Sequence, residues 1–304
     1  DWEDLARWSH IDKALELNTP DPIETYSSSP HLFTDLDIPK PVEIFNVGSG
    51  SHAEQTAGIL VKTEAALIRL KPDVVLIYGD TNSTLAGSLA ASKLGIKTGH
   101  IEAGLRSFNR SMPEEINRML TDSITDYFFT TSTSASENLL KLGSNPENVH
   151  FVGNVMIDTL YQNINRISAP DFWEEHQLSE KNYIVLTLHR PGNVDELSSL
   201  IALLHGIDDL AEDKKILFPI HPRTQAILSE SSTKFKNILF VAPQSYLNFM
   251  YLIQNSFAVI TDSGGISEET TVMGIPCFTM RNNTERPETE TIGTNTIVGT
   301  SLEN

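Results

Sequence analysis

The sequence predicts an α/β protein of two lobes, each with a parallel β-sheet covered by helices. Short β-branched and apolar runs alternate along the chain with segments of helical spacing, a pattern typical of parallel sheets. A polar stretch without strand character, residues 165–182, separates two groups of such runs. With 304 residues and 39% apolar content the chain can bury two cores. We therefore expect an N-terminal lobe over 1–168 and a C-terminal lobe over 169–304.

The expected strands follow one another in two groups. The first lobe has four and the second has five, in this order: 73–80, 96–104, 126–131, 149–154, 183–189, 216–221, 238–243, 258–265 and 275–280. Helical spacing is clearest in 52–70 and 195–210. Parallel α/β sheets bind ligands at the carboxyl ends of their strands, so the polar residues that follow these strands are candidates for a site.

Composition excludes several classes of function. A net charge of −18 argues against a basic face for nucleic acid, and the single Cys277 excludes a disulfide framework and a cysteine-rich zinc site. No apolar run approaches the roughly 18 residues of a membrane span. The N-terminal stretch is acidic and amphipathic, unlike a signal peptide. We expect a cytoplasmic protein that binds no nucleic acid, membrane or metal.

The segment 258–276, "AVITDSGGISEETTVMGIP", is the most informative one. Its strand runs into Ser263, which can cap a helix, and into Gly264 and Gly265, which open that helix. Free N–H groups at such a helix start bind phosphate, and Glu269 could accept hydrogen bonds from ribose hydroxyls. A tight strand-to-helix turn without a ligand explains the same residues equally well.

Arg281 and Arg286 lie in the loop after the expected strand 275–280. A guanidinium beside a phosphate-binding helix start would match two phosphate oxygens. The alternative for these arginines is a surface ion pair with Glu285 or Glu288, which would be functionally silent.

Two histidines close strands of the second lobe. His189 and His221 each follow an apolar run, where a histidine can protonate or hydrogen-bond a leaving phosphate near neutral pH. A structural histidine with satisfied hydrogen bonds is the alternative for each, and the functional interpretation is stronger for His189.

In the first lobe, carboxylates follow two strands and begin one helix. Asp80 and Glu102 end strands, and Glu114 follows Pro113, which suits the first position of a helix. Together they favour acid/base chemistry. The structural alternatives are a helix cap for Asp80 and a favourable helix-dipole interaction for Glu114 and its neighbour Glu115.

An ordered set of motifs identifies a resemblance. They are "GDTNSTLAGSLAA", "HIEAGLRS", "MPEEINR", "VGNVMIDTL", "LHRPGNVD", "HPRT", "DSGGISEE" and "TERPE". From about residue 31 to 304 the chain resembles UDP-N-acetylglucosamine 2-epimerases of the non-hydrolysing type. The resemblance implies two Rossmann-like lobes of the GT-B glycosyltransferase kind, a homodimer, a UDP-sugar substrate, no cofactor, and a role in cell-surface polysaccharide synthesis.

The resemblance also implies roles for single residues. The second lobe would hold the nucleotide: Ser263, Gly264, Gly265 and Arg286 for the phosphates, Glu269 for the ribose, and Gln244 and Phe249 for the uridine side. We add His221 as a substrate contact because it ends a neighbouring strand. His189 would steady the departing UDP, and the acid/base groups would be Asp80, Glu102 and Glu114.

The implied reaction is an elimination followed by re-addition. Breaking the C1–O bond to UDP makes the C2 proton removable, and a carboxylate takes it to leave 2-acetamidoglucal and UDP. A proton returned to the opposite face, with re-addition of UDP, gives the C2 epimer, UDP-N-acetylmannosamine. Because the two faces differ, one carboxylate could not easily serve both.

Members of the family begin with a strand and a "GTRPE"-like loop that this sequence lacks, and it ends at "TIVGTSLEN", ahead of the family's last helices. We expect residues 1–30 to form an acidic amphipathic helix and a loop, with Trp2, Leu5, Ile11 and Leu15 available to pack. Three alternatives to the epimerase function are kept. They are a hydrolysing epimerase that releases ManNAc and UDP, a GT-B glycosyltransferase, and a truncated nucleotide-sugar-binding protein with impaired catalysis.

Overall fold

A computed structural model of the chain describes residues 15–16, 36–37, 41–48 and 50–300. Two compact units emerge, the first containing residues 37–153 and the second residues 154–300. The division falls earlier than the expected boundary after residue 168. The reason is that α8 (Val155–Asn163) buries Leu160 in the core of the second unit.

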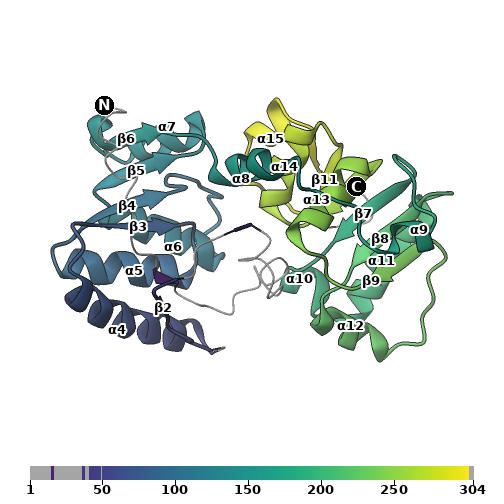
Figure 1. Cartoon of the computed structure of the whole chain (residues 1–304), viewed down its shortest axis with the longest axis horizontal. Helices are drawn as coiled ribbons and strands as arrows, with labels where there is room; N and C mark the ends of the chain where they lie inside the picture. The colour runs from purple at the N-terminus through teal and green to yellow at the C-terminus, as the bar shows by residue number, and fades with distance from the viewer. Residues whose placement is uncertain (1–14, 17–35, 38–40, 49, 301–304) are drawn as a thin grey trace. The chain divides into compact units, whose positions relative to one another are not determined.

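The first unit contains a parallel sheet of four strands in the order β3-β4-β5-β6 (Figure 1). The strands are β3 (Val74–Tyr78), β4 (Lys97–Ile101), β5 (Tyr127–Thr130) and β6 (Val149–Phe151). α4 (His52–Leu70) precedes β3. The connections between the strands contain α5 (Asn82–Lys93), α6 (Pro113–Ile124), α7 (Thr133–Lys141) and the 3₁₀ turn η2 (Pro146–Asn148).

Local sequence explains the ends of α4. Ser51 and Glu54 form a capping box, in which the Ser51 hydroxyl accepts from the Glu54 amide and the Glu54 carboxylate accepts from the Ser51 amide. Lys71 ends the helix in the left-handed conformation, with φ of 48°. The inner face of α4 packs on the small residues of α5, which in turn contacts β3 and β4.

The second unit contains a parallel sheet of six strands in the order β12-β11-β10-β7-β8-β9 (Figure 1). The strands are β7 (Tyr183–Thr187), β8 (Lys215–Pro219), β9 (Ile238–Val241), β10 (Ala258–Thr261), β11 (Cys277–Thr279) and β12 (Asn295–Ile297). Besides α8, its helices are α9 (Phe172–Glu175), α10 (Pro191–Val194), α11 (Leu197–Leu210), α12 (Pro222–Ser229), α13 (Tyr246–Asn255), α14 (Gly264–Met273) and α15 (Glu288–Thr291).

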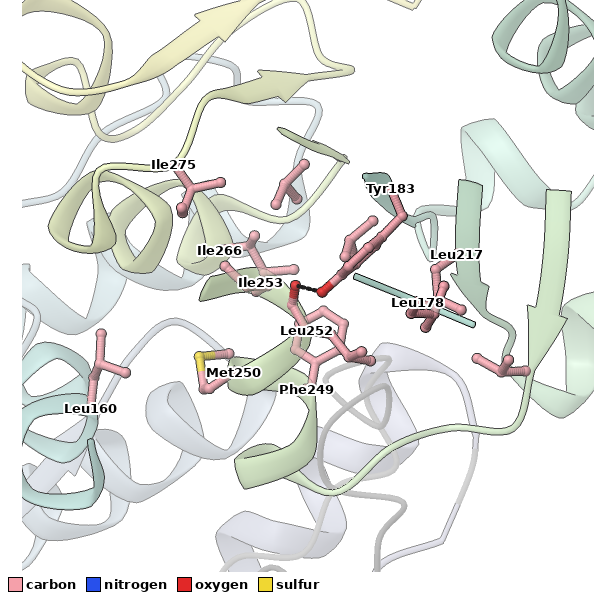
Figure 2. Packing of buried hydrophobic residues seen from close by; sticks show 13 residues of the cluster. Leu160, Leu178, Tyr183, Leu217, Phe249, Met250, Leu252, Ile253, Ile266 and Ile275 are labelled. Atoms are coloured by element: carbon pink, nitrogen blue, oxygen red, sulfur yellow. Dashed lines mark hydrogen bonds between the residues drawn. The ribbon is translucent and has the colours of Figure 1, made fainter. Parts of the chain in front are cut away.

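Two apolar clusters cover the two faces of this sheet. Successive residues of β7 alternate between them, so that Tyr183 and Val185 belong to one cluster and Leu186 to the other. Figure 2 shows the first cluster, in which the buried Tyr183 hydroxyl donates to the Leu252 carbonyl at 2.6 Å. The sheet is therefore buried on both faces, as parallel sheets usually are.

The expected strands are confirmed, and the structure adds three short ones. These are β12 and the parallel pair of β1 (Leu15–Glu16) with β2 (Glu43–Ile44). The expected N-terminal helix falls largely on residues outside those described, including Trp2, Leu5 and Ile11. At Leu15 the expectation is wrong, because this residue pairs with Glu43 as a strand. None of the helices in the described ranges combines the length and apolar character needed to cross a membrane.

Candidate active site

Asp80 lies in the turn between β3 and α5. Gly79 makes this turn with φ of +66°, a conformation that suits glycine, and its amide donates to the Ile101 carbonyl at 3.1 Å. The Asp80 carboxylate accepts from Arg118 Nε at 3.0 Å and lies 2.9 Å from Arg118 Nη2. The expectation that Asp80 caps α5 is wrong, because Thr81 occupies that position.

Glu102 follows the adjacent strand, β4, at the same edge of the sheet. Tyr78 and Ile101 are register partners, so the turns that follow them are neighbours. Glu102 has φ of +69°, which costs a residue with a side chain about 1–2 kcal/mol. Its Oε2 lies 3.9 Å from where a Cβ on Gly79 would be. The structure thus brings the Glu102 carboxylate to the Gly79–Asp80 turn.

Glu114 is the second residue of α6 and is half-buried, with Pro113 at the first helical position as expected. Its neighbour Glu115 is buried and accepts from the Ser107 amide at 2.9 Å and Arg118 Nη1 at 2.6 Å. Glu115 therefore has a structural role. It holds a loop and orients the arginine that pairs with Asp80.

Arg118 is a residue whose role the sequence analysis missed. It is 2% exposed and bonds both Glu115, one turn earlier in α6, and Asp80 in the β3 turn. The helix that begins with Glu114 is thereby tied to the Asp80 turn. The spacing of three residues between Glu115 and Arg118 was the signal available in the sequence. The second partner of Arg118, Asp80, lies far away in the sequence, and no local pattern links them.

In the second unit, His189 and Asp262 form a hydrogen-bonded pair. Thr187 and Thr261 are register partners, and the two side chains follow them at one edge of the sheet. His189 Nδ1 lies 2.6 Å from Asp262 Oδ1, and Asp262 also accepts from the Arg190 amide and from Asn193 Nδ2. Asp262 is one of the polar residues that follow an expected strand, and the sequence analysis assigned it no role.

Asp262 is fully buried, and burial by itself would raise its pKa. Hydrogen bonds from His189, Asn193 and Arg190 outweigh that effect and hold its pKa below the ordinary value. An ionised Asp262 accepts a hydrogen bond from Nδ1–H of His189. The ring is then fixed with Nε2 available for a ligand.

A pocket lies at the carboxyl ends of the second unit's strands. It gathers five of the predicted residues with five apolar or small ones: Thr187, Leu188, His189, Pro219, His221, Pro243, Gln244, Phe249, Ser263 and Ile266. Phe249 is buried in the first apolar cluster, and Gln244 donates its amide to the Ala242 carbonyl at 2.7 Å. The apolar walls and few polar groups suit a small ligand.

The start of α14 contributes Ser263, Gly264 and Gly265. Ser263 occupies the N-cap position as expected, but its hydroxyl makes no capping hydrogen bond. Its amide instead donates to Thr261 Oγ1 at 3.0 Å. Both glycines also lie close to neighbouring side chains, which would have to shift to admit a Cβ. A Cβ on Gly264 would lie 2.6 Å from Glu285 Oε1, and one on Gly265 would lie 2.9 Å from a methionine methyl group.

Arg286 lies in a buried network of charges close to Gly264. It donates to Glu285 Oε1 at 2.9 Å and to Glu268, while Arg281 donates to both oxygens of Glu285. The expected pairing with Glu285 is present, but it is buried rather than on the surface. Removing one partner would leave a buried charge without compensation.

Glu269 is 2% exposed and accepts a hydrogen bond from the Tyr246 hydroxyl at 3.0 Å. Burial raises its pKa to about 8 against the effect of that hydrogen bond, and the charge of Glu268 adds to the increase. Glu269 is therefore mostly protonated at pH 7. Tyr246 was not singled out from the sequence, because it lies on another helix.

Within the described residues no three His, Cys, Asp or Glu side chains group where they could hold a metal ion. The chemistry available to these residues is acid/base chemistry in the first unit and anion or nucleotide binding in the second.

Comparison with known proteins identifies the family. Residues 25–304 match the family model for UDP-N-acetylglucosamine 2-epimerase. A protein of that name from Methanococcus maripaludis is 45% identical over 284 residues, which are 90% of this chain and 77% of that protein. A UDP-2,3-diacetamido-2,3-dideoxy-D-glucuronate 2-epimerase of Pseudomonas aeruginosa is 39% identical over 271 residues, covering 88% of this chain and 75% of that protein.

A solved structure of a family member supports the same assignment. The crystal structure of the Methanocaldococcus jannaschii UDP-GlcNAc 2-epimerase in complex with UDP-GlcNAc and UDP has a TM-score of 0.81 at 43% identity, covering 89% of this chain and 77% of that one. The expected GT-B-like fold of two α/β lobes is confirmed. The chain belongs to the UDP-N-acetylglucosamine 2-epimerase family, a family of isomerases.

Proposed function

We propose that the protein interconverts UDP-N-acetylglucosamine and UDP-N-acetylmannosamine without hydrolysis. The observation that carries this proposal is the placement of two carboxylate residues, Asp80 and Glu102, directly after neighbouring strands, with the Glu102 carboxylate close to Gly79. Binding of a nucleotide needs no such pair. Removal and return of a proton on two faces of one carbon does need more than one acid/base group.

We assign proton transfer to Asp80, Glu102 and Glu114. After the C1–O bond to UDP breaks, one carboxylate removes the C2 proton and leaves 2-acetamidoglucal and UDP. A second one delivers a proton to the other face, and UDP adds again at C1. Arg118 Nε and Nη2 hold the Asp80 carboxylate in place at the turn after β3.

We assign the nucleotide to the pocket of the second unit. His189 would donate Nε2–H to the departing phosphate, and the ionised Asp262 at Nδ1 would stabilise positive charge on the ring. The remaining contacts are proposed as the resemblance implies: Ser263, Gly264, Gly265 and Arg286 for the diphosphate, Glu269 for the ribose, and His221, Gln244 and Phe249 for the uridine side.

The test is incubation with UDP-GlcNAc in deuterated water, followed by NMR. The proposal expects UDP-ManNAc to accumulate, with deuterium at C2 in both nucleotide sugars. Free ManNAc and UDP without UDP-ManNAc would establish the hydrolysing alternative. UDP binding in calorimetry without any C2 exchange would establish a binding protein. A parallel incubation with UDP-2,3-diacetamido-2,3-dideoxy-D-glucuronate compares the substrate named for the Pseudomonas relative. The homodimer, the cytoplasmic location and the polysaccharide role stay predictions.

A further inference from the structure

His100 is a buried histidine of β4 that the proposed chemistry does not use. Its side chain is completely buried, two residues before Glu102. Its Nε2 lies 2.8 Å from the Gly79 carbonyl oxygen, and its Nδ1 lies 2.7 Å from Asp122 Oδ1 on α6. Both ring nitrogens therefore face oxygen atoms.

The partners decide which atoms carry protons. A carbonyl oxygen only accepts, so Nε2 must donate to Gly79. Burial by itself would raise the pKa of Asp122, but His100 and Arg106 hold that pKa below its ordinary value, so Asp122 accepts as well. His100 thus donates to the β3 turn through Nε2 and is hydrogen-bonded to α6 through Nδ1.

Asp122 extends this link to the loop that follows Glu102. Its Oδ2 lies 2.6 Å from Arg106 Nη2 and accepts from the Gly104 amide at 3.2 Å. The same loop is also held by Asn138, whose amide donates to the Gly104 carbonyl at 3.0 Å. The turn before Asp80 and the loop after Glu102 are therefore joined through one histidine and one aspartate.

We propose that His100 is a positioning residue for epimerisation, which orients the Gly79–Asp80 turn against Glu102 through its hydrogen bond to the Gly79 carbonyl. The inference rests on the proposed acid/base roles of Asp80 and Glu102. Gly79 has wide conformational freedom, and without Nε2–H its carbonyl loses the partner that fixes the peptide plane leading to Asp80. A displacement of about 1 Å at a reacting group can lower the rate about 10²-fold.

Two substitutions separate the two hydrogen bonds of His100. In His100→Gln the side-chain amide can reach the place of Nε2 and keep the bond to Gly79. In His100→Asn the amide can reach only the place of Nδ1, so it keeps Asp122 and loses Gly79. Each variant removes one hydrogen bond, so a purely structural role would affect them alike.

The measurement is kcat, KM and the rate of C2 deuterium exchange, with UDP affinity from calorimetry. We expect His100→Asn to lower kcat and exchange about 10²-fold at unchanged UDP affinity, and His100→Gln to retain most of the activity. His150→Gln, a histidine of β6 in the same unit, is the control and should match the wild type. Equal losses in both His100 variants, or no loss in His100→Asn, would overturn the inference.

A second measurement does not depend on activity or on folding of the variants. In ¹⁵N NMR of the wild-type chain, the Nε2 of His100 should carry a slowly exchanging proton across pH 6–9. A His100 ring whose Nε2 is unprotonated would overturn the inference even in an inactive chain. Conversely, wild type without C2 exchange but with a protonated Nε2 would refute the proposed function and leave the hydrogen bond to Gly79 established.

Discussion

Replacing Asp262 with asparagine tests the pairing that orients His189. Asp262 is completely buried and receives hydrogen bonds from His189 Nδ1 at 2.6 Å, from the Arg190 amide at 3.0 Å and from Asn193 Nδ2 at 2.9 Å. Asparagine has nearly the same shape but no charge, and its NH₂ group can donate to Nδ1. The imidazolium of His189 would then lose its counter-charge and the ring its fixed tautomer.

The size of the effect follows from the bond that is lost. A hydrogen bond to a charged group contributes about 1.5–3 kcal/mol. If that energy stabilises the imidazolium when UDP departs, kcat should fall about 10- to 160-fold, since each 1.36 kcal/mol is tenfold in rate. KM should change little, because the charge on His189 matters most as the phosphate leaves.

The assay is steady-state kinetics by NMR with a thermal unfolding curve for each variant. Asp209→Asn, an exposed aspartate of α11, is the matched control and should behave as wild type. The wild type should also be more stable than Asp262→Asn at neutral pH. Because the pKa of Asp262 is lowered in the folded state, that advantage is present above the unfolded pKa of about 4 and is lost as pH falls further. An unchanged kcat in a folded Asp262→Asn variant would refute the role of the pair.

Three further substitutions probe other buried groups. Arg118→Met should lower the free energy of unfolding by about 3–5 kcal/mol in urea titrations, because it leaves Glu115 buried without its cation. Gly264→Ala should weaken UDP binding at least about tenfold in calorimetry, because a Cβ 2.6 Å from Glu285 Oε1 must displace that carboxylate from its ion pairs with Arg281 and Arg286 or shift the start of α14. Glu269→Gln should raise stability more at pH 8 than at pH 5. The pKa of Glu269 is raised to about 8, so its contribution is complete below the unfolded pKa of about 4.3 and is lost as pH rises toward 8.

The first two substitutions have a control variant, and each of the three has a result that would contradict it. Arg118→Lys keeps the positive charge. If its free energy of unfolding falls as much as that of Arg118→Met, the ion pair is not what stabilises the protein. Gly274→Ala, at the end of α14 with φ of +68°, should reduce stability rather than UDP affinity, and an effect on affinity equal to that of Gly264→Ala would contradict the steric argument. For Glu269→Gln, a stability difference that does not vary between pH 5 and pH 8 would mean that Glu269 is ionised in the folded protein.

Local sequence patterns predict most of the strands of this fold. The runs that became β3 to β11 are short, β-branched and bounded by polar residues, and strand formation of this kind depends on neighbouring residues. The sequence did not predict β12, because this strand has only three residues and no alternation of apolar and polar residues. The cap expected at Asp80 was wrong because Thr81 offers the same chemistry one residue later.

The sequence by itself determined the α/β class, most strands, the family and the candidate residues, because spacing and ordered motifs are properties of the chain alone. Only the tertiary structure decided which side chains meet. Asp262 reaches His189, Arg118 reaches Asp80, and His100 reaches Gly79 and Asp122 through sheet order and register. The protonated state of Glu269 likewise depends on burial. Partners and burial arise from packing between distant segments, and no local pattern encodes them.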